Sequence, residues 1–428
     1  MGVIRSGQIL FLCALALLMV GVLMVTSAGM VIEPASAETP VQVGGGLSPV
    51  TMLSGRIGIY MALAMAAMAC TAFMPARLVN SLLTPSPRRV WPLLAFGVGM
   101  MLVVLLLVYV PGISRNRNFS SRWIEVPAPV LGTVSIQPSE FIKWSMLGLL
   151  AWCAVSAGDR LQKFWTGLVP LLAALGIVCA VIMKEDLGTA VLIGASGGII
   201  LIAAGAKLWH VGLLAPAGLA VVAAGLFTSD YRMRRITSFM DPYADPAGDG
   251  FHIIQSMGAI ANGEVVGRGL GHGLQKFGYL PEDTTDFIFA IIAEELGLFG
   301  VALVLFLYII LLTTGLDIAK RERRPVARLF ALGVVATIGL QACINLLVVT
   351  KLAPTKGIAL PLISSGGTGW ILTSAALGML IRFDRSAGQT SVSTQNIDTD
   401  LDAQSDAELD ECDEPEEPEL GSPAGALA

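Results

Sequence analysis

The sequence predicts an all-α polytopic membrane protein, with about ten transmembrane helices and a large extracytoplasmic loop between helices seven and eight. Of its 428 residues, 54% are hydrophobic and only 14% are charged, and the mean hydropathy is +0.73. Apolar runs of about 20 residues, enough to cross a hydrocarbon core, recur along the chain. Because every backbone polar group in lipid must be paired internally, such runs are typical of helices rather than barrel strands.

The expected spans follow one another closely up to residue 228 and resume at residue 286. We interpret the first as a retained helix rather than a signal peptide, because it is long and ends well before the cleavage-like triplet Ala35-Ser36-Ala37. The fourth is short and polar at its start. The spans cover residues 8–28, 55–75, 92–112, 140–156, 165–183, 188–206, 208–228, 286–315, 328–351 and 358–381.

Two domains are expected. Residues 1–382 form the membrane domain, including the large loop of residues 229–285. Within that loop, Phe251 to Ala261 has the pattern of a short helix that Asn262-Gly263 would end. Residues 383–428 form a tail with twelve Asp and Glu and no Lys or Arg from Asp398 onward. That composition predicts a disordered, acidic, cytoplasmic tail.

The charge of the short loops predicts the orientation. Lys and Arg gather in the loops after spans two, four and eight, which places both termini in the cytoplasm. The loop of residues 113–139 then lies outside, yet it carries Arg115, Arg117 and Arg122. Basic charge on the outer side is contrary to the positive-inside rule, and it indicates that an anion is handled there.

No cofactor site is evident. Five of the six cysteines lie in apolar spans without metal-ligand spacing, and no nucleotide-binding fingerprint is present. We therefore expect no metal ligands and no nucleic-acid partner, although a divalent cation remains compatible with the sequence.

The segment of residues 275–297 places three acidic residues at the start of span eight and inside it. Asp286 lies where a polar, Gly-rich loop turns into span eight, and Glu294 and Glu295 lie inside that span. A carboxylate within the membrane is costly and is by default a functional residue. The alternative for the two glutamates is a buried structural hydrogen-bonded pair. Small residues at Ala290, Ala293 and Gly297 predict a stripe, continuing from Asp286, where a helix or ligand chain comes close.

Other charged segments have a structural and a functional interpretation. Ser139 is expected to cap span four, with Glu140 and Lys143 as an i,i+3 pair that forms either a local ion pair or an anion site. The turn of residues 184–189 is either solvated or part of a substrate path. The glycine-dense segment 267–273 is either a flexible loop or a phosphate-binding nest. Polar residues Gln341 and Asn345 in span nine are expected to join helices by hydrogen bonds.

Several motifs together resemble the SEDS family (shape, elongation, division, sporulation), and its FtsW, or cell-division, branch more than its RodA, or elongation, branch. They run in the family's order from span three to span ten. The matching segments are Arg122-Trp123, residues 137–143, residues 186–189, residues 241–246, residues 275–282, residues 285–290, residues 294–297, residues 354–361 and residues 364–367.

The resemblance implies a ten-helix peptidoglycan glycosyltransferase of the bacterial inner membrane. Such enzymes polymerise lipid II, the undecaprenyl-linked disaccharide peptide, and work with a class B penicillin-binding transpeptidase and other division or elongation proteins. Asp286 takes the position of the family's catalytic acid. The substrate-binding residues expected from the motifs and their charges are Arg122, Glu140, Lys143, Asp186, Lys276, Glu282, Lys356, Ser364 and Ser365.

The chain departs from the family pattern at several positions. Thr284 replaces a usual His before the Thr-Asp-Phe motif, and Ser365 replaces a usual Tyr. Lys184-Glu185 and Lys351 also differ from the pattern. Two other functions are compatible with the sequence. One is a lipid II flippase, because intramembrane charges and broken helices are also typical of transporters. The other is a non-catalytic division scaffold, which the acidic tail and the missing His favour.

Overall fold

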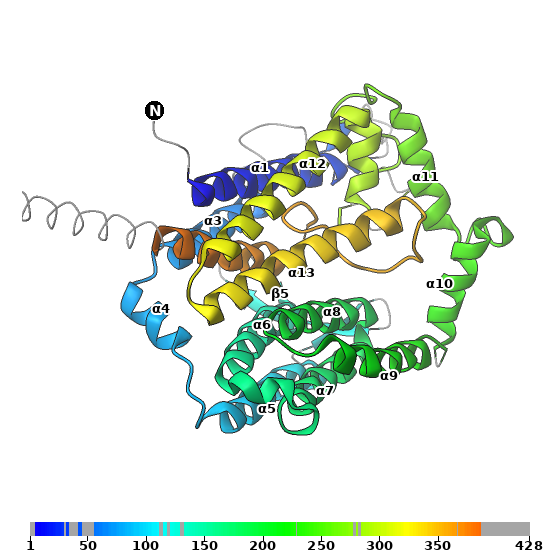
Figure 1. Cartoon of the computed structure of the whole chain (residues 1–428). Coiled ribbons are helices and arrows are strands. Elements are labelled where there is room, and N and C mark those ends of the chain that lie inside the picture. Colours follow the sequence, from blue (N-terminus) through cyan, green and yellow to red (C-terminus); the bar gives the residue numbers. More distant parts are fainter. Residues whose placement is uncertain are drawn as a thin grey trace, which may run out of the picture. The chain divides into compact units, whose positions relative to one another are not determined.

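The computed structural model describes residues 5–29, 31–33, 42–44, 55–110, 114–117, 120–128, 132–227, 229–276, 280, 284–365 and 367–386. The expected acidic tail from residue 387 onward lies outside the described residues. The fold is helical (Figure 1). Its helices are α1 (Ser6–Ala28), α3 (Arg56–Ala72), α4 (Ala76–Leu83), α5 (Val90–Leu106), α6 (Pro138–Ala157), α7 (Val169–Glu185), α8 (Leu187–Ala203), α9 (Leu208–Phe227), α10 (Asp230–Met240), α11 (Phe251–Gly263), α12 (Ile288–Arg321), α13 (Pro325–Val349) and a last helix of residues 368–386.

Each of the ten expected spans overlaps one of these helices. Among the described residues, seven helices are long and apolar enough to cross a membrane, or eight if α3 and α4, which are bent by 80° against each other, count as one span. Helix α8 is apolar throughout but has only 17 residues. The protein is therefore an all-helical polytopic membrane protein in which some helices are short or bent.

The loops carry structure that the hydropathy pattern did not predict. Strands β1 (Val31–Glu33) and β2 (Gln42–Gly44) form a hairpin. Strands β3 (Ser114–Arg117), β4 (Ser120–Ala128) and β5 (Gly132–Ile136) form an antiparallel sheet in the order β3-β4-β5. In the large loop, α10 was not predicted, whereas α11 is the short helix expected there. Short 3₁₀ turns lie at η1 (Leu107–Tyr109), η2 (Gly158–Gln162) and η4 (Pro242–Ala244), and a π-turn lies at η3 (Phe164–Leu168).

Helix α13 connects two groups of helices. It packs against α12, which in turn contacts α1 and α11, and it also packs against α6 and α8 (Figure 1). Close approach is possible because small residues lie at the contacts. At Gly333 of α13, for example, an added Cβ would lie 2.5 Å from Cδ1 of Ile200 in α8.

Two local expectations about helix starts need correction. Helix α6 begins at Pro138, and Gln137 rather than Ser139 takes the N-cap position, without a side-chain bond. The last helix begins at residue 368, ten residues later than expected. The preceding segment is irregular, and it is tolerated because it is enclosed by protein: Leu360, Leu362 and Ile363 are at most 1% exposed.

The expected small-residue stripe of span eight is not a groove for a ligand. Asp286 lies in a turn before α12, and Gly297 breaks the helix with a φ of 63°. The chain itself covers this face, because a Cβ at Gly263 would lie 1.8 Å from the carbonyl oxygen of Ala293 and one at Gly267 would lie 2.3 Å from that of Glu295. The close approach predicted from the small residues is therefore made by the large loop.

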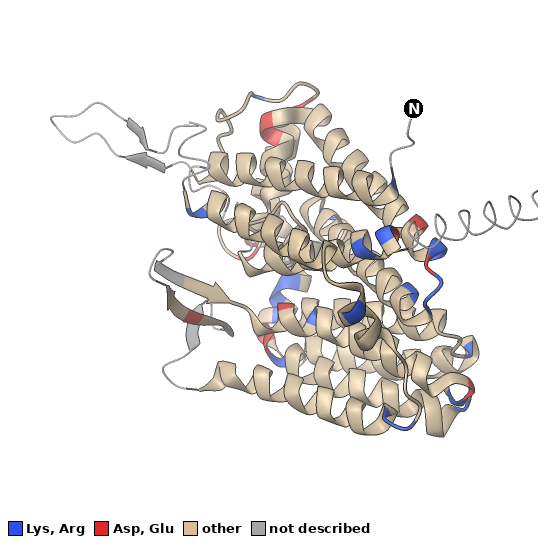
Figure 2. Ribbon diagram, turned by 90° about the vertical axis from the view of Figure 1, so that its left-hand side faces the viewer, with Lys and Arg blue, Asp and Glu red and all other residues tan. Residues whose placement is uncertain are grey.

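The two ends of the membrane domain lie on one side, together with the basic loops. Ser6 donates a hydrogen bond to Asp317 (2.8 Å), and the backbone N–H of Gly7 donates to Asp384 (3.0 Å). Arg324, in the basic loop before α13, reaches the side chain of Asn80 at 3.2 Å. Figure 2 shows many of the Lys and Arg residues at the end of the helices away from β3–β5.

Candidate functional site

The extended segment of residues 354–360, between α13 and the last helix, is the centre of the site. Two amides on one face of α13 hold it: Asn345 Nδ2 donates to the carbonyl oxygen of Ile358, and Gln341 Nε2 donates to that of Ala359, both at 2.8 Å. Arg235 of α10 donates to the carbonyl oxygen of Thr355 at 3.2 Å. Gln341 and Asn345 were expected to join helices by hydrogen bonds. They do form such bonds, which connect α13 to the segment that follows it.

Asp286 lies against this segment. It is half-buried, and its backbone oxygen accepts a second bond from Asn345 Nδ2 at 2.8 Å. A Cβ added to Gly357 would lie 3.0 Å from Asp286 Oδ2, so the carboxylate approaches because Gly357 has no side chain. Gly357 itself is exposed. The carboxylate thus lies next to a part of the chain that is open to its surroundings.

Glu140 and Lys143 form the expected i,i+3 ion pair. Lys143 Nζ lies 2.8 Å from both Glu140 carboxylate oxygens and 3.1 Å from Gln341 Oε1. Because Gln341 also binds Ala359, this pair is connected to the central segment. The Lys143 side chain is 1% exposed and that of Glu140 is 15% exposed, so the carboxylate is the more accessible member of the pair.

Lys356 brings a cation to the same segment. Burial lowers the pKa of its ammonium below the usual 10.5, the nearby Arg232 guanidinium lowers it further, and the Asp186 carboxylate opposes both effects. Asp186 also caps α8, accepting from Thr189 N at 3.0 Å and Thr189 Oγ1 at 2.8 Å. Arg232 is held in place by the carbonyl oxygens of Gly225, Met183 and Lys184.

The two serines differ in their surroundings. Ser364 is 1% exposed, and its hydroxyl accepts from the backbone N–H of Leu360 at 2.7 Å. Its carbonyl oxygen accepts from Trp370 Nε1, which closes the turn before the last helix. Ser365 is exposed, and its backbone N–H donates to the carbonyl oxygen of Thr284 at 2.9 Å. Ser365 thus borders the turn that carries Asp286, whereas Ser364 has a structural position.

Lys276 lies in a different, closed network with the two glutamates of α12. Its ammonium is 2.8 Å from Glu295 Oε1, and both side chains are fully buried. Ser27 of α1 donates to the same carboxylate at 2.7 Å. Glu294 accepts from two loop amides and Glu295 from two more. The hydrogen-bonded pair weighed as the alternative for the glutamates is therefore what the structure contains.

The same network includes part of the glycine-dense segment and Lys276, for which ligand binding was considered. The amides of Gly271 and Gly273 bind the Glu295 carboxylate, so this part of the glycine-dense segment is occupied by an anion of the chain itself. Lys276 was expected to bind substrate, but its enclosed ammonium holds the loop to α12 and α1. Arg122 belongs to strand β4, but its side chain is outside the part of the chain that the structure describes. Glu282 lies entirely outside the described residues. Strand β4 packs against α6 and α7.

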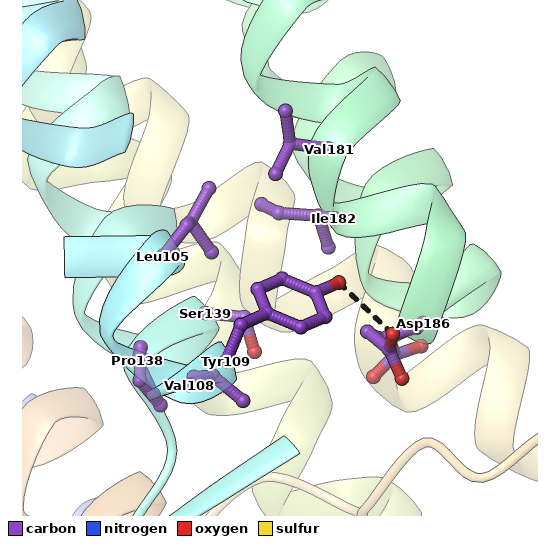
Figure 3. A pocket seen from close by; sticks show the side chains of 9 residues that line it. Leu105, Val108, Tyr109, Pro138, Ser139, Val181, Ile182 and Asp186 are labelled. Carbon is purple, nitrogen blue, oxygen red and sulfur yellow. Dashed lines mark hydrogen bonds between the residues drawn. The ribbon is translucent and has the colours of Figure 1, made fainter. Parts of the chain in front are cut away.

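A small pocket adjoins the site between α5, α6 and α7 (Figure 3). Its cavity volume is about 30 Å³, and its lining is largely apolar, with Leu105, Val108, Val181 and Ile182 facing it. At its edge the Tyr109 hydroxyl donates to Glu185 Oε1 at 2.9 Å. Asp186, which influences Lys356, also lines the pocket.

Sequence reasoning missed several residues of the site. Arg232 and Arg235 belong to α10, whose amphipathic pattern was not singled out within the large loop. The ring of His252 on α11 stacks on Phe287, the residue after Asp286, at a centroid distance of 5.8 Å. Gly357 was part of the matching motif of residues 354–361, but its own role was not predicted, because it depends on a residue distant in sequence. In the part of the chain that is described, no three His, Cys, Asp or Glu residues come together as a metal site.

Comparison with known proteins agrees with this architecture. The sequence model of the family described as "Cell cycle protein", which groups FtsW, RodA and SpoVE, matches residues 7–389. A probable peptidoglycan glycosyltransferase FtsW of Geobacter sulfurreducens is 38% identical over 281 residues, which is 65% of this chain and 74% of the relative. Stage V sporulation protein E of Bacillus subtilis is 39% identical over 298 residues, 69% of this chain and 80% of the relative.

Solved structures give the same fold. A chain from the work "Structural coordination of polymerization and crosslinking by a peptidoglycan synthase complex" superposes with a TM-score of 0.64 at 27% identity, covering 88% of this chain and 97% of the other. The rod shape determining protein RodA of Thermus thermophilus superposes with a TM-score of 0.53 at 22% identity, covering 88% of this chain and 96% of the other. With the family match over most of its length, the chain belongs to the cell cycle protein family of FtsW, RodA and SpoVE.

Proposed function

We propose that this protein is a peptidoglycan glycosyltransferase that polymerises lipid II at the outer face of the bacterial inner membrane. The observation that carries the proposal is the position of Asp286: a half-buried carboxylate beside the exposed Gly357, in the segment that also presents Lys356. The relatives named as probable peptidoglycan glycosyltransferases support the same activity.

The chemistry needs one base and fixed cations. A sugar hydroxyl of one lipid-linked unit attacks the anomeric carbon of another. A glycosidic bond forms, the anomeric bond to the lipid pyrophosphate breaks, and the hydroxyl proton leaves. Asp286 takes that proton as general base, a contribution typically of about 10²–10⁴-fold in rate. Lys356 faces the departing pyrophosphate and stabilises its charge, together with Arg122 of the neighbouring sheet.

The lipid chain of the substrate needs an apolar path. We place the start of this path at the aliphatic residues around the small pocket between α5, α6 and α7, because they border Asp186 and thereby the surroundings of Lys356. The pocket's own volume of about 30 Å³ is too small to hold the chain. The small-residue face of α12 does not provide such a path, since the large loop covers it.

Partner and orientation follow from the same proposal. The basic loops lie on the side where Ser6 and Asp384 lie, so we place both termini in the cytoplasm and the 229–285 loop outside. The related chain belongs to a peptidoglycan synthase complex that couples polymerization and crosslinking. We therefore propose a class B penicillin-binding transpeptidase as partner, and septal wall synthesis as the setting, because several relatives carry the name FtsW.

A reconstitution experiment tests the proposal. Purified protein in liposomes is supplied with labelled lipid II, with and without a co-purified transpeptidase. We expect glycan polymer. Translocated lipid II without polymer would instead identify a flippase. If neither polymer nor translocated lipid II formed, with or without the transpeptidase, the scaffold function would be supported.

A further inference from the structure

We propose that Asn345 is a positioning residue that fixes Asp286 against the 356–358 segment and thereby sets the rate of the glycosyl transfer. This inference rests on the proposed function for its activity readout. It concerns a side chain that need not touch substrate, since Asn345 is 1% exposed.

The geometry points to one amide bridging two separate parts of the chain. Asn345 Nδ2 has two hydrogens, and they go to the carbonyl oxygens of Asp286 and Ile358, both at 2.8 Å. One acceptor belongs to the turn before α12 and the other to the extended segment after α13. No second side chain among the described residues bonds both of these carbonyl oxygens.

The bridge acts where a small displacement matters. The Asp286 carboxylate is already so close to Gly357 that a single added methyl would lie 3.0 Å from Oδ2. Residue 357 lies between Lys356 and Ile358, so the bond to the Ile358 carbonyl sets the separation of Asp286 from the cation. A reacting group that is misplaced by about 1 Å can lose about 100-fold in rate.

The other end of the amide supports this role. Asn345 Oδ1 is buried and has no hydrogen-bond partner among the described residues. A buried amide oxygen without a partner lowers stability, so an apolar residue of similar volume would suit this position better if packing alone were required. The two bonds from Nδ2 are what an apolar residue could not replace.

Two variants separate positioning from folding. Asn345→Leu keeps the number and branching of the side-chain heavy atoms and removes both bonds. Cys343→Ala, on an exposed position of the same helix, is the matched control. We expect Asn345→Leu to lower kcat for lipid II polymerisation about 10- to 100-fold while KM stays within about twofold, and Cys343→Ala to change neither. If Asn345→Leu retained the wild-type kcat, the proposal would be wrong.

A double-mutant cycle and a thiol pair complete the test. Gly357→Ala displaces the same carboxylate. The fold reduction of kcat in the double variant should therefore be smaller than the product of the fold reductions in the two single variants. A reduction equal to that product would show that the two substitutions act independently. Independently of activity, cysteines introduced by Asp286→Cys and Gly357→Cys should form a disulfide at least about tenfold more slowly in the Asn345→Leu background. An unchanged rate overturns the positioning role. A slower rate, found while the wild-type protein makes no polymer from lipid II, would preserve the positioning role and refute the proposed function.

Discussion

At the scale of single residues, the site has one carboxylate next to an exposed residue and several charged side chains that are buried. Asp286 lies beside the exposed Gly357, whereas Lys143 and Lys276 are almost completely buried in ion pairs. Buried pairs of this kind contribute little net stability compared with apolar residues, but each charge depends strongly on its partner. Lys356, which is only half-buried, is the cation best placed to meet a substrate.

The local contacts of the site could be predicted, and the distant ones could not. The Glu140–Lys143 pair follows from i,i+3 spacing on one helix. The approach of Asp286 to Gly357 spans 71 positions, and the influence of Asp186 on Lys356 spans 170. Such contacts are set by tertiary packing and leave no spacing pattern. Only the resemblance to a family brought those residues together in advance.

The Glu140–Lys143 pair provides a stability prediction. Lys143→Met leaves Glu140 without its counter-charge in a largely buried position, which typically costs about 3–5 kcal/mol. The double variant with Glu140→Gln removes both charges and should be closer to wild type than Lys143→Met alone. Thermal unfolding of the purified proteins in detergent gives the comparison. A double variant less stable than the single one would show that the charge imbalance is not the cause.

Lys356 provides a pH prediction. Because its pKa is lowered from 10.5, the folded protein loses this charge at a lower pH than the unfolded chain does. Between the lowered pKa and 10.5 the unfolded state binds more protons, so this group makes stability rise with pH. Below the lowered pKa the ammonium is charged and available to a pyrophosphate. Lipid II polymerisation should therefore decline on the alkaline side.

Two variants move that alkaline limb in opposite directions. Lys356→Arg keeps its charge throughout and should shift the decline to higher pH. Asp186→Asn retains an N-cap acceptor for α8 but removes the opposing charge, so the decline should begin at lower pH. The measurement is the initial rate of polymerisation against pH. Identical limbs in all three proteins would exclude Lys356 as the titrating group.

At the scale of elements, the large loop is built into the membrane domain. The backbone N–H groups of Arg268 and Gly269 donate to the carbonyl oxygens of Glu294 and Glu295, at 3.0 and 2.9 Å. The kink at Gly297 frees this stretch of α12 to accept such bonds. Hydropathy predicted where the helices lie, because burial in lipid dictates composition. It did not predict α10 or β3–β5, because these elements lie in the loops, where burial in lipid does not dictate composition.

Gly297 is the residue on which this arrangement depends. With a φ of 63°, an added Cβ would lie 2.4 Å from the backbone N of Gly267. Gly297→Ala should destabilise by more than the roughly 1–2 kcal/mol of the left-handed conformation alone. Gly99→Ala, also in an apolar helix but with nothing within 4 Å of the added methyl, is the control. Equal melting temperatures for the two variants would contradict the role of the kink.

At the scale of the whole molecule, the basic loops lie together at one end of the helices. The loops at Arg77–Arg89 and Lys320–Arg328 lie on the side of Ser6 and Asp384, as the contacts of Asp317 and Asn80 show. The site with Asp286 and Ser365 lies at the connection between the large loop and α12. A membrane placed across the helices therefore separates the basic loops from the site.

This separation predicts how two introduced cysteines react. In a variant without native cysteines, Ser365→Cys should react with a membrane-impermeant maleimide in cells whose outer membrane alone has been opened. Arg323→Cys should react only after the inner membrane is disrupted. Both positions are exposed in the structure, so access is determined by the membrane. The reverse order of labelling would place the site in the cytoplasm.

The most direct measurement is the lipid II polymerase activity of Asp286→Asn beside that of Asp249→Asn, which alters a partly exposed carboxylate paired with Arg234. Both proteins should fold and insert as the wild type does. If Asp286 is the general base, Asp286→Asn loses about 10²–10⁴-fold in rate while Asp249→Asn retains wild-type activity. A folded Asp286→Asn protein that polymerises lipid II at the wild-type rate would contradict the account.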